Sequence, residues 1–237
     1  MRKDGAGVLL REVYERLYAA YGPQDWWPGD GPIETIIGAV LTQNTAWTNA
    51  KRALERLKEA GAMSPAALRA LPEARIAELV RSSGSYNVKA RKLKAVAEWL
   101  GEYGDDPAQL ARREAKALRR EALGVYGVGP ETADVIVLYA AGLPSFVIDA
   151  YTIRVLERLG IEPERRSYEG YQALFEERLP PDAPFFNEFH ALLDVHASAT
   201  CRKRAPLCGE CPLREVCAYG GASAASAGGL ASAPRLA

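Results

Sequence analysis

The fold of this chain is decided by the stretch Leu123-Gly124-Val125-Tyr126-Gly127-Val128-Gly129-Pro130-Glu131-Thr132-Ala133-Asp134. The pattern indicates the end of one helix, a glycine-rich turn and the start of a second helix. Gly127 and Gly129 allow backbone angles that a side chain would forbid, and Pro130 suits the first position of a helix. Bare amides at such a turn can bind one phosphate group. The pattern alone is equally compatible with a plain connector between two core helices.

A carboxylate, Asp149, lies further along, between the apolar run Phe146-Val147-Ile148 and a second helical pattern. Taken alone, Asp149 is best read as an N-cap, because aspartate is common there. Taken together, the hairpin and the aspartate resemble the helix-hairpin-helix DNA glycosylases of the endonuclease III superfamily. The resemblance implies that the amides of Gly127, Val128 and Gly129 hold the DNA backbone. It also implies that Asp149 is the catalytic carboxylate.

The composition is that of a soluble globular chain. Its 237 residues are 48% hydrophobic and 25% charged, and the 30 basic and 30 acidic residues cancel. Any nucleic-acid contact must therefore come from a local patch of positive charge. No apolar run is long enough for a membrane span, and residues 1–4 do not look like a signal peptide. We expect a cytoplasmic protein that acts at the nucleoid, without a membrane partner.

The first helical pattern covers residues 8–21 and ends in a loop over residues 21–32 that is rich in proline and glycine. The loop carries two adjacent rings, Trp26 and Trp27. Large rings in a loop often staple it to the core. Equally, they can form the aromatic wall of a base pocket, because a base taken out of its duplex is commonly held between rings.

A buried helix is predicted over residues 33–41, followed by polar residues and a helix over residues 46–59. The polar residues can cap the next helix. A glutamine, however, donates and accepts hydrogen bonds at once, which suits filling the hole left by an extruded base. The family's hole-filling glutamine lies in a motif that Leu41-Thr42-Gln43-Asn44-Thr45 resembles, so the resemblance implies this DNA-binding role for Gln43.

Short helices are predicted from Ser64 and from about Pro72, and then comes the stretch Gly84-Ser85-Tyr86-Asn87-Val88-Lys89. The basic residues Lys89, Arg91, Lys92 and Lys94 gather here, which is most often a solvated helix face. Tyr86 beside these cations favours DNA binding instead. In the resembling family this loop inserts a residue, often large and apolar, opposite the lesion. Here that residue is Ser85, and we include Ser85, Tyr86 and Lys89 in the DNA-binding set.

Helices are also predicted over residues 107–122, 150–160, 168–177 and 186–197, and no stretch has the alternation of a strand. We therefore predict an all-α protein of two helical domains with a DNA groove between them. One domain covers residues 33–143 and ends in the hairpin, and the other joins residues 1–32 to 144–219. The Gly/Ala/Ser-rich tail 220–237 is expected to be disordered.

All four cysteines lie in one short segment, as Cys201-x6-Cys208-x2-Cys211-x5-Cys217. Disulfides are disfavoured in a reducing compartment. Zinc is possible, although its usual signature is two short cysteine pairs. Four thiolates are also the ligand set of a [4Fe–4S] cluster, and the spacing is similar to that of endonuclease III, which favours this cofactor. Between the first two ligands lies the basic run Arg202-Lys203-Arg204, which can bind phosphates.

The resemblance breaks at one position. Bifunctional members place a lysine two residues after the final hairpin glycine, where its amine attacks the sugar, and this chain has Glu131 there. A carboxylate cannot form an imine. Base removal is therefore expected to be hydrolytic, with weak or absent lyase activity. Glu131 itself either stabilises the first turn of its helix or belongs to the catalytic base pocket.

Three functions are compatible with these motifs. The first is a monofunctional glycosylase, closest in motif to the 3-methyladenine branch because of Tyr21-Gly22-Pro23-Gln24 and the two tryptophans that follow. The second is a bifunctional glycosylase and lyase. The third is a DNA-binding or redox-sensing relative with little catalysis. We favour the first, acting as a monomer on double-stranded DNA that contains a damaged base.

Overall fold

The computed structural model describes residues 3–24 and 30–221. Every regular element in these residues is helical, and they contain no strand, so the predicted all-α class is confirmed. The elements are α1 (Lys3–Tyr21), α2 (Pro32–Thr42), α3 (Trp47–Glu59), α4 (Pro65–Ala70), α5 (Glu73–Leu79), η1 (Arg81–Ser83), α6 (Tyr86–Gly101), η2 (Pro107–Arg112), α7 (Ala115–Leu123), α8 (Pro130–Val135), η3 (Ile136–Ala140), α9 (Ala150–Leu159), α10 (Tyr168–Glu176), α11 (Ala183–Ala199), η4 (Cys208–Glu210) and η5 (Arg214–Val216). None of the helices in the described ranges combines the length and apolar character of a membrane span.

The chain folds into two compact units. Unit 1 comprises Met1–Asp25, Ile148–Pro180 and Glu188–Ala237, and unit 2 comprises Trp26–Val147 and Pro181–Asn187. Unit 1 is thus assembled from both ends of the chain, whereas unit 2 is nearly continuous. Helix α11 begins in the short second segment of unit 2 and continues into unit 1.

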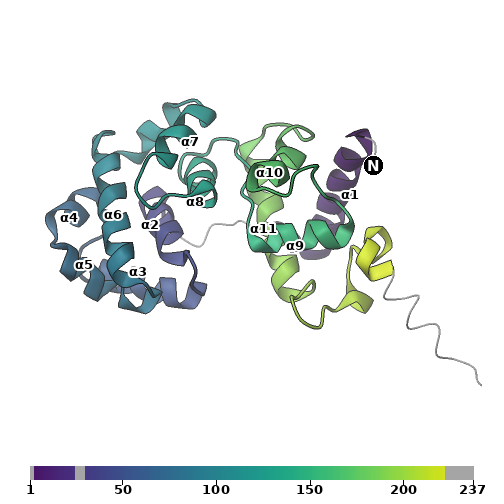
Figure 1. Ribbon diagram of the computed structural model, residues 1–237, viewed down its shortest axis with the longest axis horizontal. Helices are drawn as coiled ribbons and strands as arrows, with labels where there is room; N and C mark the ends of the chain where they lie inside the picture. Colours follow the sequence, from purple (N-terminus) through teal and green to yellow (C-terminus); the bar gives the residue numbers. More distant parts are fainter. Residues whose placement is uncertain (1–2, 25–29, 222–237) are drawn as a thin grey trace, which may run out of the picture. The chain divides into compact units, whose positions relative to one another are not determined.

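The core of unit 2 surrounds α2, whose residues from Glu34 to Leu41 are all buried. Helices α3, α6 and α8 and the π-helical turn η3 pack against it (Figure 1). A helix that is apolar on all sides has to be enclosed in this way. The one buried carboxylate of α2, on Glu34, forms an ion pair with Lys58 of α3 at 2.7 Å.

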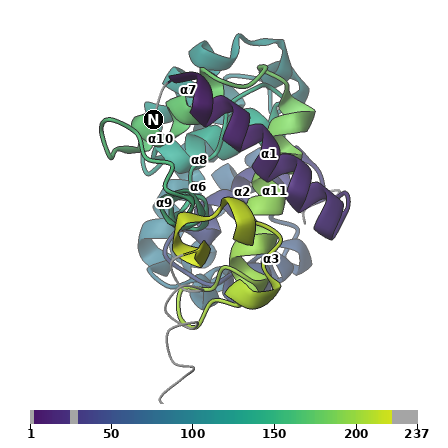
Figure 2. The same ribbon diagram turned by 90° about the vertical axis from the view of Figure 1, so that its right-hand side faces the viewer.

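The core of unit 1 is built on α1, α10 and α11. The apolar face of α1 is formed by Leu10, Val13 and Leu17, which are fully buried. Phe189 of α11 packs edge-on against Tyr14 of α1 and Phe175 of α10, with ring centroids 5.4 and 5.5 Å apart. Figure 2 shows α1 and the segment that follows α11, which carries η4 and η5, from the side.

The single helix predicted over residues 107–122 is wrong: η2 ends at Arg112, Arg113 is extended, and α7 starts anew. The cause is Glu114, whose carboxylate caps α7 by accepting hydrogen bonds from the amides of Lys116 and Ala117. The predictions for Trp26 and Trp27 and for the tail beyond residue 221 lie outside the described residues.

Candidate active site

The hairpin consists of α7, the turn from Gly124 to Gly129, and α8. Gly127 has a φ of +83°, and a Cβ there would lie 2.2 Å from Lys92 Cγ, so glycine is required twice over. Gly129 has ordinary extended angles, with φ −95° and ψ 179°, so the predicted need for a special angle is wrong there. Nothing lies within 4 Å of its Cβ position, so a ligand can reach this backbone.

The amides of the turn are not equivalent. Val128 N donates to Val125 O at 3.1 Å, and the Val128 side chain is buried, so this amide is used inside the turn. Within the part of the chain that the structure describes, the amides of Gly127 and Gly129 donate no hydrogen bond. The bare donors expected from the sequence are therefore these two and not Val128.

Gln43 braces the hairpin from the end of α2. Its Nε2 donates to Gly127 O at 3.0 Å and to Thr132 Oγ1 at 2.9 Å, and its Oε1 accepts from Lys92 Nζ at 2.5 Å. The sequence did not predict this brace, because its partners lie far along the chain. To fill a hole in DNA, Gln43 would have to exchange these hydrogen bonds for contacts with bases.

A buried ion pair locks the two hairpin helices together. Asp134 of α8 is fully buried and accepts from Arg119 Nε at 2.8 Å and Nη2 at 3.1 Å. Ser145 Oγ also donates to its Oδ1 at 2.5 Å. The cation and the hydrogen bonds offset the large cost of removing this carboxylate from water. This pair fixes the angle at which α8 leaves the turn.

The loop before α6 has a strained tip. Gly84 and Ser85 both have positive φ, 68° and 45°, and the exposed Ser85 lies in the left-handed region. Non-glycine residues rarely adopt this conformation, and it is often kept at functional sites. Tyr86 is half-buried, with the guanidinium of Arg81 5.7 Å from its ring centroid.

Lys89 does not lie on this surface, so its predicted contact with DNA is wrong. The side chain is buried, and Nζ donates to Leu41 O at 2.7 Å and to Ser83 O at 2.6 Å. Burial, with a smaller contribution from Lys92, lowers the pKa of Lys89 to about 8. Lys89 therefore joins the end of α2 to η1 and fixes the loop from inside.

Glu131 lies in the first turn of α8 and is exposed. An acidic residue is favourable there because the first turn of a helix carries a partial positive charge.

Asp149 caps α9 in unit 1. Its Oδ1 accepts from Thr152 N at 2.7 Å, which confirms the predicted N-cap. Its side chain is 19% exposed, and Oδ2 lies 4.0 Å from His190 Nε2. Because capping uses only one oxygen, the other remains able to face a substrate. The two interpretations of Asp149 are thus compatible.

Two titratable residues of α11, His190 and Asp194, lie near this carboxylate. Burial lowers the pKa of His190, against the opposing charge of Asp149, so the imidazole is neutral at neutral pH. Burial and then Asp149 raise the pKa of Asp194 to about 7. Neither residue was identified as part of the site from the sequence. The available signal was two polar residues one helical turn apart in an otherwise apolar stretch.

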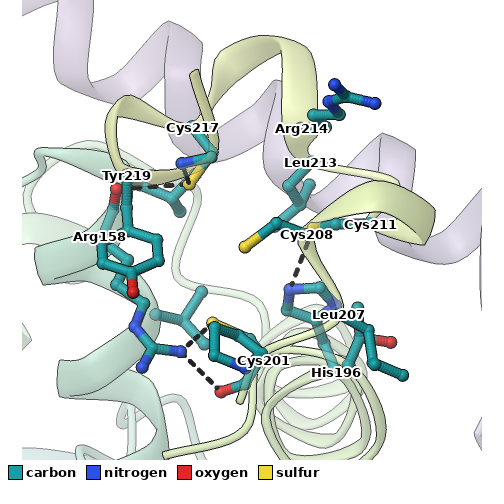
Figure 3. Close-up of a pocket in the computed structure, with 15 residues that line it drawn as sticks. Arg158, His196, Cys201, Leu207, Cys208, Cys211, Leu213, Arg214, Cys217 and Tyr219 are labelled. Carbon is teal, nitrogen blue, oxygen red and sulfur yellow. Dashed lines mark hydrogen bonds between the residues drawn. The ribbon is translucent and has the colours of Figure 1, made fainter. Parts of the chain in front are cut away.

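The four cysteines line one pocket, and Figure 3 shows their sulfur atoms around it. None is in a disulfide. Arg158 Nη1 donates to Cys201 Sγ at 3.2 Å, and Gly220 N donates to Cys217 Sγ at 3.4 Å. His196 is buried, and its Nδ1 lies 2.9 Å from the Tyr21 hydroxyl. Its Nε2 lies 3.8 Å from Cys211 Sγ. Donors of this kind suit thiolates that carry negative charge.

The four cysteine sulfurs do not gather around the position of a single metal ion. In the described residues no three His, Cys, Asp or Glu side chains converge as ligands of a single ion. A cubic iron–sulfur cluster binds each thiolate at a different iron, so its ligands are spread more widely than those of zinc. The cysteine set fits such a cluster.

The basic loop between the first two cysteines is held by its main chain. Arg158 donates to the carbonyls of Cys201, Arg202 and Lys203 at 3.1, 2.8 and 3.3 Å. The side chains of Arg202, Lys203 and Arg204 are all exposed. The loop therefore presents its charges to solvent on a fixed backbone.

A braced hairpin in one unit, and a capped aspartate with a four-cysteine cavity in the other, define an all-helical protein of the helix-hairpin-helix class. The model of the HhH-GPD superfamily base excision DNA repair proteins matches residues 37–181. The chain belongs to this superfamily and, within it, to the endonuclease III-like DNA glycosylases.

Curated relatives resemble nearly the whole chain. The chain is 39% identical over 217 residues to a protein of Methanocaldococcus jannaschii named "Putative DNA repair glycosylase MJ1434", covering 91% of this chain and 98% of that protein. It is 30% identical over 186 residues to endonuclease III of Sulfolobus acidocaldarius, covering 78% and 81%.

Solved structures share the fold. A trapped endonuclease III–DNA covalent intermediate matches with a TM-score of 0.78 at 23% identity, covering 92% of this chain and 98% of that chain. The 3-methyladenine DNA glycosylase of H. pylori bound to 1,N6-ethenoadenine matches with a TM-score of 0.69 at 26% identity, covering 81% and 97%.

Proposed function

We propose that the protein is a monofunctional DNA glycosylase, which hydrolyses the N-glycosidic bond of a damaged base flipped out of double-stranded DNA. The observation that carries this proposal is that the chain holds one carboxylate, Asp149, in place at a helix cap and has another carboxylate, Glu131, in the first turn of α8. The first can support bond cleavage. The second cannot form the imine that a lyase requires.

In this proposal Asp149 acts through the oxygen that the cap leaves available. Loss of the base leaves positive charge on the sugar, and a fixed carboxylate stabilises that charge and orients the attacking water, as at other glycosidic bonds. A neutral His190 leaves the negative charge of Asp149 uncompensated, which keeps its attraction for the sugar cation. Thr152 N fixes the carboxylate in place before substrate arrives.

Binding of DNA is assigned to several surfaces. We infer that the amides of Gly127 and Gly129 and the basic loop Arg202-Lys203-Arg204 contact phosphates, because backbone amides and cations recognise phosphate without reading sequence. The loop tip Ser85-Tyr86 and Gln43 contact the duplex opposite the lesion. Trp26 and Trp27 form the base pocket, where stacking favours a cationic alkylated purine.

We further propose that Cys201, Cys208, Cys211 and Cys217 hold a [4Fe–4S] cluster. The widely spread sulfurs and the N–H donors near three of them support this assignment. When bound, the cluster ties the two ends of the segment together and so stiffens the basic loop. Binding of DNA phosphates depends on the side chains of that loop.

The test is a panel of duplexes that each carry one lesion, alkylated purines included, assayed for base release with and without alkali. We expect an intact abasic site that breaks only after alkali. Glu131→Lys should add some strand nicking, and borohydride should trap that variant on DNA while the parent stays untrapped. Efficient trapping of the parent would show that another amine is the nucleophile and that the protein is bifunctional.

Asp149→Asn separates catalysis from capping, because asparagine caps a helix about as well as aspartate. We expect a loss of orders of magnitude in the rate of base release, with the melting temperature nearly unchanged. Asp106→Asn is the matched control, since Asp106 caps η2 in the same way through Ala108 N. Equal activity of the two variants would exclude Asp149 as the catalytic carboxylate.

A further inference from the structure

Two cations of α6 lie against the hairpin turn. The guanidinium carbon of Arg91 lies 5.2 Å from the centroid of the Tyr126 ring. The stem of Lys92 crosses Gly127 so closely that a Cβ there would lie between 2.2 and 2.7 Å from three of its carbons. Two consecutive residues of α6 thus cover two consecutive residues of the turn.

No carboxylate in the described part of unit 2 forms an ion pair with Arg91 or Lys92. In residues 30–147, neither Arg91 nor Lys92 forms an ion pair, although other arginines of unit 2 do, namely Arg69, Arg75, Arg113 and Arg119. The remaining lysines of α6 are bound to carbonyls: Lys89 is buried, and Lys94 Nζ donates to Arg69 O and Leu71 O at 2.9 and 2.7 Å. Of the basic cluster on α6, these two charges stay available.

The ammonium of Lys92 is held in place before any ligand binds. Gln43 Oε1 accepts one of its three N–H groups at 2.5 Å, and the other two can serve an anion. The neighbouring turn is accessible, since Tyr126 is 50% exposed and the space beyond Gly129 is open. A cation fixed by a neighbour loses little freedom on binding, which favours affinity.

We propose that Arg91 and Lys92, which we term the hairpin cation pair, bind the phosphodiester backbone of DNA beside the turn. The proposal rests on the proposed function and adds two contacts to it. The chemistry is recognition of phosphate by paired donors, without reading of bases. Lys92 also links this contact to Gln43, since the same ammonium donates to Gln43 Oε1 and to the phosphate.

The experiment measures binding of the full chain to a labelled undamaged duplex, by fluorescence anisotropy over a series of salt concentrations. Lys92→Met keeps the stem that lies on Gly127 and removes the charge. We expect affinity to fall about fivefold to tenfold. The plot of log affinity against log salt should be shallower by about one unit for each phosphate that the variant no longer neutralises. Arg91→Met should act in the same direction.

Two further variants make the result specific. Lys92→Arg keeps the charge and should keep the parental salt slope. Lys116→Met removes one exposed charge at the far end of α7 and should leave the slope unchanged. Thermal unfolding of each variant shows whether it is folded, and Arg91→Met, whose side chain lies on the surface, remains informative if Lys92→Met unfolds.

The outcomes separate this inference from the proposed function. If Lys92→Met and Arg91→Met both bind as Lys116→Met does, the hairpin cation pair is overturned, even when the parent releases a damaged base. If the parent releases no base from any duplex but both variants show reduced affinity and a shallower slope, the hairpin cation pair stands and the glycosylase proposal fails.

Discussion

Asp194 shows how the surroundings of the candidate catalytic residue affect stability. The pKa of its carboxyl is raised to about 7 in the folded protein, because it is half-buried beside Asp149, whereas its ordinary pKa is 3.8. Between these pH values the unfolded chain binds fewer protons than the folded one. The free energy of unfolding therefore falls as pH rises from about 4 to 7 and stays reduced above that range.

Asp194→Asn removes this dependence, because asparagine has the same size and cannot ionise. We expect the variant and the parent to melt at similar temperatures at about pH 4.5, and the variant to melt higher at about pH 8. At about pH 8 the melting temperature of the variant should exceed that of the parent by roughly 2–4 °C for each kcal/mol by which ionised Asp194 destabilises the parent. Circular dichroism melts at both pH values check this, with the exposed Glu177→Gln as control. A difference that is the same at both pH values would contradict the assignment.

The two hairpin glycines allow stability and binding to be separated at the scale of the element. Gly127→Ala forces a left-handed alanine into the stem of Lys92, which should cost at least about 1–2 kcal/mol of stability. Gly129→Ala is unstrained and should change stability by less than about 0.5 kcal/mol.

Both alanine variants should nevertheless bind DNA more weakly, because the added methyl group of Gly129→Ala lies in the open space through which a backbone would approach. Chemical denaturation measures the stability of both variants, and fluorescence anisotropy on the same samples measures their affinity for DNA. If Gly129→Ala binds DNA with the affinity of the parent, the DNA backbone does not approach Gly129 closely.

The Arg119–Asp134 pair should determine whether the hairpin keeps its shape. Arg119→Met leaves the buried carboxylate of Asp134 with the Ser145 hydroxyl as a donor but without its cation. Breaking a buried pair typically costs about 3–5 kcal/mol, and urea denaturation should show this decrease in stability. Arg75→Met, which breaks an exposed pair with Glu78, should cost less than about 1 kcal/mol.

Elements whose signals are local could be predicted from the sequence. Ser64 does cap α4 through Ala67 N, Pro130 does open α8, and Asp149 does cap α9. Lys89 was misplaced because a lysine suggests solvent, and only the carbonyls of Leu41 and Ser83, brought together by the fold, make its burial favourable.

The brace at Gln43 and the carboxyl of Asp194 depend likewise on residues that are distant in sequence. No periodicity or spacing reveals such partners. The sequence therefore predicts which residue types form the candidate site. It does not predict the hydrogen bonds and ion pairs that hold them.

At the scale of the whole molecule, we expect the cysteine segment to depend on the proposed cluster for its structure. Residues 201–217 contain only short 3-10 turns, and Leu213 is their one buried hydrophobic residue among those described. Hydrogen bonds from Arg158 to the first part of the segment, and a bound group, therefore hold it in place of a packed core. We expect about four iron atoms per chain and a yellow-brown colour. After removal of iron with a chelator, this segment should become sensitive to protease while residues 30–147 stay protected. Stoichiometric zinc without iron would contradict the cluster.

The assembly of unit 1 from both ends of the chain affects how the protein is made. Helix α1 packs on α10, which begins at Tyr168, so α1 leaves the ribosome long before its partner exists. At about 5–20 residues per second this interval is on the order of 7–30 s. Unit 2 can fold almost completely in that time, while Leu10, Val13 and Leu17 stay uncovered. During synthesis the nascent chain therefore carries a nearly complete hairpin unit behind an amphipathic helix with an uncovered apolar face, which is a natural substrate for chaperones, and the four-cysteine segment emerges later still.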